Sequence, residues 1–210
     1  GREGGPPADR ILPADGDSTG RELVRVLLEV VYNHPSIRVF DHCFALDLIT
    51  ADDHAGAAVL GAVTRHPKYG LQMIWARSTV LASGGAGRVY RETTNPRVST
   101  ADGIAMAYRA GAAVADMAFV QFHPTVLYLP GAPRSLISEA VRGEGAALVD
   151  VAGERFMPAV HEMGDLAPRD IVSRSIVERV ARTGGSHVFL DARDVAGFAT
   201  RFPGITATLG

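Results

Sequence analysis

The chain has 210 residues, of which 47% are hydrophobic, and its formal net charge is −2. Acidic and basic residues are interspersed along it, so charge gives no reason to expect nucleic acid or an anionic membrane as a partner. No run approaches the roughly 18 apolar residues of a membrane span. One cysteine, Cys43, excludes an internal disulfide framework and a cysteine-rich metal site. We expect a soluble, cytoplasmic protein without a bound metal.

The first third of the chain predicts a helix, a strand and a short meander. Thr19 and Glu22 have the spacing of a capping box, apolar residues follow at helical spacing, and Asn33-His34-Pro35 ends the helix. Three segments rich in β-branched and aromatic residues then predict strands. These segments are 37–49, 57–63 and 71–83.

The last predicted strand leads directly into the glycine-rich sequence SGGAG (83–87). A buried strand that ends in glycines lets backbone amides approach a ligand closely, although a tight turn without a ligand accounts for the sequence equally well. No G-x-G-x-x-G fingerprint occurs in the chain. Residues 101–119 predict a helix rich in alanine and glycine, and capping of its N-terminus alone would account for Asp102.

The second half predicts an α+β unit that is separate from the first. A helix within 135–150 breaks at Gly143, and Asp150–Gly153 forms a hairpin turn. Pro168 fits the first turn of the next helix, and Asp165 can precede it as a cap. Further elements are the helix 171–182, a strand at 187–193 and a short helix within 194–205.

Five segments taken together resemble the flavoprotein family of succinate dehydrogenase, fumarate reductase and aspartate oxidase. They are LASGGAGRVYRETTNP (81–96), ADGIAMAYRAGAAVADMAFVQFHPT (101–125), SEAVRGEGA (138–146), GERFMP (153–158) and LAPRDIVSRSI (166–176). The resemblance implies an α/β plus α+β fold with FAD as cofactor: a partial, Rossmann-like FAD-binding domain at 1–118 and an α+β capping domain at 119–210. It also implies that the family's dinucleotide-binding motif and its C-terminal part lie outside this chain, so that the chain alone is inactive.

Within the family, SEAVRGEGA, LAPRD and FLDAR look more like the aspartate oxidases than the dehydrogenases. The implied reaction is FAD-dependent oxidation of L-aspartate to iminoaspartate, with oxygen or fumarate as acceptor. It begins de novo NAD biosynthesis and implies a functional link to quinolinate synthase. Two alternatives stay open. One is a fumarate reductase or succinate dehydrogenase flavoprotein subunit, and the other is a non-catalytic domain, which Ala118 favours because the family commonly has glutamate there.

The same resemblance assigns substrate-site residues. Arg169 matches an arginine that faces the reacting carbons of the substrate and moves a proton in fumarate reduction. His123 and Ser138 match positions that hold the distal carboxylate, and Gln121 matches a neighbouring position in that pocket. Glu139 is either the charge partner of Arg169 or a plain ion-pair partner of the nearby Arg142. Without the resemblance, His123 would be interpreted as a core histidine bonded to the backbone.

The remaining assignments concern the substrate's amino group and the cofactor. Glu3 matches an acidic residue near that amino group. Phe44 and Ala45 match positions at the end of a strand that contact the adenosine part of FAD, although Phe44 alone would be interpreted as a core residue. Ser83, Gly84 and Gly85 match the glycine turn under the cofactor, and Asp102 matches a contact on the flavin side.

Overall fold

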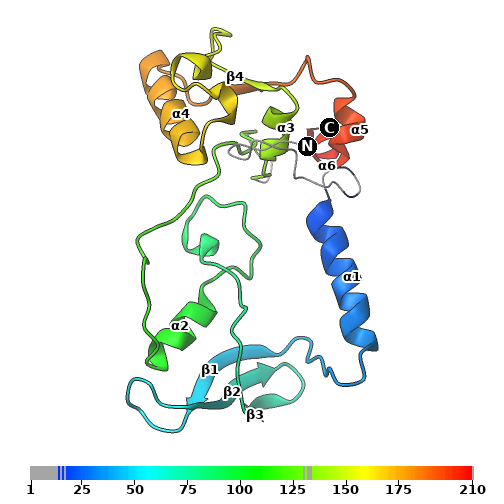
Figure 1. Cartoon of the computed structure of the whole chain (residues 1–210), viewed down its shortest axis with the longest axis vertical. Helices are drawn as coiled ribbons and strands as arrows, with labels where there is room; N and C mark the ends of the chain where they lie inside the picture. Colours follow the sequence, from blue (N-terminus) through cyan, green and yellow to red (C-terminus); the bar gives the residue numbers. More distant parts are fainter. Residues whose placement is uncertain (1–13, 15, 17, 130, 132–133, 210) are drawn as a thin grey trace. The chain divides into compact units, whose positions relative to one another are not determined.

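The computed structural model describes residues 14, 16, 18–129, 131 and 134–209 (Figure 1). It separates into two compact units, one formed by residues 31–120 and the other by the described residues up to Val30 together with 121–209. The division at residue 118 into an FAD-binding and a capping domain stays a prediction. The described residues before Val31 group with the second half of the chain, whereas the sequence placed them in the first domain.

The first helix, α1 (Thr19–Asn33), begins at Thr19 itself. Thr19 is therefore the first helical residue, and the predicted capping box is wrong in that respect. The carboxylate of Glu22 accepts hydrogen bonds from Arg25 at 2.7 and 2.8 Å, because side chains three residues apart on a helix meet on one face. The predicted end of the helix at Asn33 is confirmed.

The unit of residues 31–120 contains a three-stranded antiparallel sheet in the order β1-β2-β3, and Figure 1 shows the strands side by side. The strands are β1 (Phe44–Thr50), β2 (Val59–His66) and β3 (Gly70–Trp75). The amides of Lys68 and Tyr69 donate to Nδ1 of His66 at 3.0 and 3.3 Å, which closes the turn between β2 and β3. The predicted meander is therefore confirmed.

The predicted strand 71–83 continues only as far as Trp75. Beyond it the chain has no strand structure, and Val80 is 88% exposed, so the expectation of a buried strand at Thr79–Leu81 is wrong. The reason is that a strand needs a neighbour to pair with its backbone groups. None of the described strands lies beside this segment.

The short helix η1 (Gly87–Val89) follows the glycine turn, and α2 (Asp102–Arg109) comes next. The sequence predicted a helix as far as residue 119, but α2 ends at Arg109 because Gly111 adopts φ +81°, a left-handed conformation that stops a helix. The guanidinium of Arg109 donates to Asp47 on β1 at 2.9 Å, which ties α2 to the sheet.

The other unit combines helices with a two-stranded antiparallel sheet, in which Leu148 of β4 pairs with Leu190 of β5. The largest of its fully buried side chains are Phe202, Leu148, Met157, Val141 and Val172. Its elements are α3 (Glu139–Gly143), β4 (Ala147–Val149), η2 (Met157–Ala159), η3 (Gly164–Leu166), α4 (Arg169–Thr183), β5 (Phe189–Asp191), α5 (Phe198–Arg201) and α6 (Pro203–Leu209).

Most local predictions for this unit are confirmed, including the break at Gly143 and the turn at 150–153, where the Gly153 amide donates to the Asp150 carbonyl at 2.9 Å. The cap assigned to Asp165 is wrong. Pro168 is the N-cap of α4, and the Asp165 carboxylate instead accepts from the Leu148 amide at 2.8 Å.

Among the described residues, no helix is long and apolar enough to cross a membrane.

Candidate functional site

The site begins at the N-terminus of α3. The hydroxyl of Ser138 accepts a hydrogen bond from the Ala140 amide at 3.2 Å and caps the helix. The cap fixes the backbone at Glu139, whose side chain is only 4% exposed. One turn later Arg142 is 2% exposed, and its guanidinium donates to the Asp165 carbonyl oxygen. A short helix thus holds two charged side chains in the protein interior.

Arg169, the first residue of α4, contacts this helix. Its Nε lies 2.6 Å from Oε2 of Glu139, and its Nη1 donates to Oε1 of Gln121 at 3.3 Å. The positive end of a helix dipole disfavours a cation at this position, so the carboxylate of Glu139 supplies the compensating charge. The structure therefore shows a contact with Arg169, one of the two partners proposed for Glu139.

His123 is held by its own loop. The Thr125 amide donates to Nδ1 of His123 at 3.2 Å, and the Thr125 hydroxyl donates to the Ile137 carbonyl at 2.9 Å. Nδ1 can take either role toward the Thr125 backbone, depending on the tautomer of the neutral ring. Nδ1 also lies 3.1 Å from the Thr125 carbonyl, to which it donates when the ring is protonated. The sequence analysis did not identify Thr125 as a residue that positions His123. Its position two residues after the histidine could have indicated this role.

The pKa of His123 lies below its ordinary value of 6.5. Burial of the ring is the main cause, and the positive charges of Arg169 and Arg142 act in the same direction. The backbone bond to Thr125 and the charge of Glu139 oppose the shift without cancelling it. The shift favours the neutral ring.

The structure brings most of the predicted substrate residues into one cluster. Gln121 and Glu139 both contact Arg169, while the Thr125–Ile137 bond ties the loop of His123 to the residue that precedes Ser138. The cluster combines a cation with neutral donors, which is the chemistry that a carboxylate ligand requires. The roles of these residues toward a ligand stay predictions. Glu3 lies outside the described residues.

The buried residue Asp165 contacts the cluster through Arg142 of α3. Asp165 is 3% exposed and its Oδ2 forms an ion pair with Nη2 of Arg155 at 2.7 Å. Its Oδ1 accepts from the Leu148 amide on β4, and its carbonyl accepts from Arg142. Asp165 therefore joins α3, β4 and the segment before α4. The sequence pattern indicated only a helix cap here.

The glycine turn and the start of α2 form a second group in the other unit. The Ala101 amide donates to the Gly85 carbonyl at 3.2 Å, and a Cβ placed on Gly103 would lie 1.8 Å from Oγ of Ser83. Gly84 has φ +79°, and a Cβ at Gly84 or Gly85 would meet no heavy atom within 4 Å. The turn thus packs closely on one side and leaves its glycine backbone accessible on the other, which fits the approach of a bulky cofactor.

The other predicted cofactor residues lie in the same unit. Asp102 is the first residue of α2 and accepts from the Thr100 hydroxyl, while the N-cap position belongs to Ala101, whose side chain makes no capping bond. Phe44 and Ala45 are the first residues of β1 and therefore lie at its N-terminal end. Phe44 is 55% exposed and is not a core residue of the described unit. Their contacts with a cofactor stay predictions.

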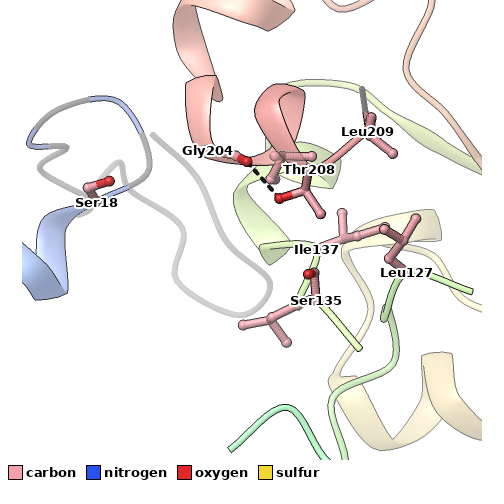
Figure 2. A pocket seen from close by; sticks show the side chains of 9 residues that line it. Ser18, Leu127, Ser135, Ile137, Gly204, Thr208 and Leu209 are labelled. Carbon is pink, nitrogen blue, oxygen red and sulfur yellow. Dashed lines mark hydrogen bonds between the residues drawn. The ribbon is translucent and has the colours of Figure 1, made fainter. Parts of the chain in front are cut away.

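The hollow in Figure 2 contains none of the predicted site residues. Its volume is about 190 Å³, and the hydroxyl of Thr208 donates to the Gly204 carbonyl at 2.9 Å as an internal bond of α6. A larger apolar cavity of about 890 Å³ includes Thr125 but not His123 or Arg169. Within the described parts of the chain, no group of three or more His, Cys, Asp or Glu side chains is placed to hold a metal ion.

The chain as a whole matches a known class of protein. The FAD binding domain family matches residues 1–209, and the chain belongs to this family. The match confirms the prediction of FAD as the cofactor. Together with the solved structure described next, it also confirms the predicted fold class.

The chain is 46% identical over 215 residues to an L-aspartate oxidase of Mycobacterium tuberculosis (strain H37Rv), covering 99% of this chain and 38% of the relative. It is 48% identical over 200 residues to L-aspartate oxidase 2-b, chloroplastic, of Nicotiana tabacum, covering 90% of this chain and 31% of the relative. A solved structure titled "Quinol-Fumarate Reductase with Menaquinol Molecules" matches with a TM-score of 0.78 and 35% identity, over 90% of this chain and 35% of that one. The chain thus spans between 31% and 38% of the length of these proteins.

Proposed function

We propose that this chain forms part of an FAD-dependent L-aspartate oxidase, which converts L-aspartate to iminoaspartate with oxygen or fumarate as the electron acceptor. The observation that carries the proposal is the contact between Arg169 and Glu139 beside His123. The relatives named L-aspartate oxidase support the same substrate. A cytoplasmic location, entry of the product into de novo NAD biosynthesis and a functional link to a quinolinate synthase belong to the same proposal.

The cluster suits a substrate with two carboxylates. A guanidinium has five N–H donors, of which Nε addresses Glu139 and one on Nη1 addresses Gln121. The donors that remain can bind one substrate carboxylate. His123, in the tautomer that carries its proton on Nε2, and the hydroxyl of Ser138 bind the other. FAD, when bound by the glycine turn and its neighbours, supplies the hydride acceptor.

Arg169 has the setting that a second task would require. An arginine ordinarily keeps its proton, so proton movement through it needs an acidic neighbour in an enclosed place. Glu139 is such a neighbour, with a side chain 4% exposed and 2.6 Å from Nε. We assign Arg169 to hold a substrate carboxylate, to stabilise developing charge and, when fumarate is reduced, to deliver a proton.

A fumarate reductase or succinate dehydrogenase flavoprotein subunit is the second candidate, because the solved structure of a quinol-fumarate reductase shares this fold. Both reactions use dicarboxylates, so the cluster alone does not separate them. Steady-state assays of the full-length protein on L-aspartate and on succinate do. We expect turnover of L-aspartate and loss of fumarate reduction in Arg169→Leu. Turnover of succinate alone would contradict the proposal.

A further inference from the structure

A β-bulge interrupts β1 next to the residues that are predicted to contact the adenosine part of FAD. In the register of β1 against β2, Ala45 pairs with Thr64 and Asp47 pairs with Val63, so Leu46 has no partner across the ladder. Such an extra residue bends its strand and disrupts the ladder locally. The backbone carbonyl of Leu46 is therefore available to a donor from outside the sheet.

Arg109, the last residue of α2, supplies that donor. Its Nη2 donates to the Leu46 carbonyl at 3.1 Å, and its Nε donates to Oδ2 of Asp47 at 2.9 Å. The carboxylate is itself held in place, because its Oδ1 accepts from the Leu48 amide at 3.0 Å. A guanidinium is a planar fork of donors that can bind two acceptors at once. One side chain thus fixes the conformation of the bulge.

We propose that Arg109 is a positioning residue for the adenosine end of FAD. The cofactor follows from the family match, and the proposal rests on the predicted contact of Phe44 and Ala45 with the adenosine part. These two residues directly precede the bulge. A bulge with a fixed conformation presents them in one place before the cofactor binds. Ordering a loose segment during binding lowers affinity, and the bonds from Arg109 remove that cost.

The N-terminal end of α2, where Asp102 is predicted to contact the flavin, is held by different interactions. The Ala101 amide donates to the Gly85 carbonyl at 3.2 Å, and Gly103 packs closely against the glycine turn. Neither interaction involves Arg109, which lies at the opposite end of the helix. Loss of the Arg109 side chain should therefore loosen the bulge and leave Asp102 in place.

The affinity for two flavins tests the proposal, because FMN carries the same flavin as FAD but lacks the adenosine part. The FAD-free full-length protein is titrated with each flavin, and the change in flavin fluorescence gives the Kd. We expect Arg109→Ala to raise the Kd for FAD by about tenfold and to change the Kd for FMN by less than about twofold. Arg109→Lys, which offers a point charge in place of the fork, should give an intermediate Kd for FAD.

Arg91→Ala is the matched control, because Arg91 lies in the same unit and forms an ion pair with Glu92 while its side chain is 92% exposed. It should change neither Kd. An unchanged Kd for FAD in Arg109→Ala would overturn the proposal. An equal loss of affinity for FAD and FMN would also overturn it, because Arg109 would then support the whole unit and not the adenosine end. Neither titration contains L-aspartate, so the result is independent of the proposed substrate.

Discussion

Nε of Arg169 lies 2.6 Å from Oε2 of Glu139, although the two residues are 30 positions apart in the chain. Each begins a helix, Glu139 in α3 and Arg169 in α4. The carboxylate is 4% exposed and the arginine side chain 35% exposed. The pair therefore joins two helix starts, and its buried member depends on its partner for charge compensation.

Arg169→Leu should destabilise the protein by about 3 kcal/mol, because it leaves the buried carboxylate of Glu139 without this cation. Urea unfolding measures the change. The control Arg174→Leu removes a surface ion pair with Asp170 on the same helix and should change stability by less than about 1 kcal/mol. The double variant with Glu139→Gln should lose less than the sum of the two single changes. Strict additivity would show that the contact contributes nothing.

Stability should fall as the pH decreases below 6.5, in part through His123. Its native pKa is below the ordinary value, so the unfolded chain binds this proton more tightly. The contribution is complete above pH 6.5 and is lost as the pH falls through the native pKa. Urea unfolding over this range should therefore show a shallower pH dependence in His123→Asn than in the unsubstituted protein. His54→Asn, changed at a ring that is 65% exposed, is the control. An unchanged slope in His123→Asn would contradict the assignment.

Gly103→Ala should destabilise the protein, although alanine is ordinarily better in a helix by about 1 kcal/mol. The added Cβ would lie 1.8 Å from Oγ and 2.8 Å from Cβ of Ser83, so the glycine turn must move. Adding Ser83→Gly removes both atoms and should restore stability. Gly20→Ala, on α1 with no heavy atom within 4 Å of the new Cβ, should be neutral or stabilising. Thermal unfolding measures all three variants, and no rescue by Ser83→Gly would refute the contact.

Asp165→Ala should cost about 1–3 kcal/mol, because the Leu148 amide loses its acceptor in a buried place. Arg155→Ala removes the other side of the ion pair, but its side chain is 55% exposed, so a loss below about 1 kcal/mol is expected. Denaturant unfolding compares the two. Equal losses would mean that the ion pair, and not the amide bond, is the important interaction.

Local patterns predicted those elements whose causes are local. The turn at 150–153 and the helix α4 follow from residues within them. The strand predicted at 79–83 is not formed. A strand needs a neighbouring strand to pair with, and the sequence of the segment does not specify that neighbour. The helix cap predicted for Asp165 was wrong, because its carboxylate accepts a hydrogen bond from the Leu148 amide, 17 residues away in the chain.

The site was predicted by resemblance more than by pattern. Residue types alone favoured a core role for His123, and the sequence left Arg169 and Arg142 as alternative partners of Glu139. The structure supplies what spacing does not contain, namely the contact of Arg169 with Glu139 and the bonds of His123 to the backbone of Thr125. The first contact joins residues 30 positions apart in the chain, and the second depends on the orientation of the His123 ring.

Anaerobic reduction of the bound flavin tests the central claim most directly. The full-length protein with FAD is mixed, without oxygen, with L-aspartate or with succinate, and the visible absorbance of the oxidised flavin is followed. We predict that L-aspartate bleaches the flavin and that Arg169→Leu slows this reduction by at least about 100-fold. Bleaching by succinate with none by L-aspartate would contradict the account.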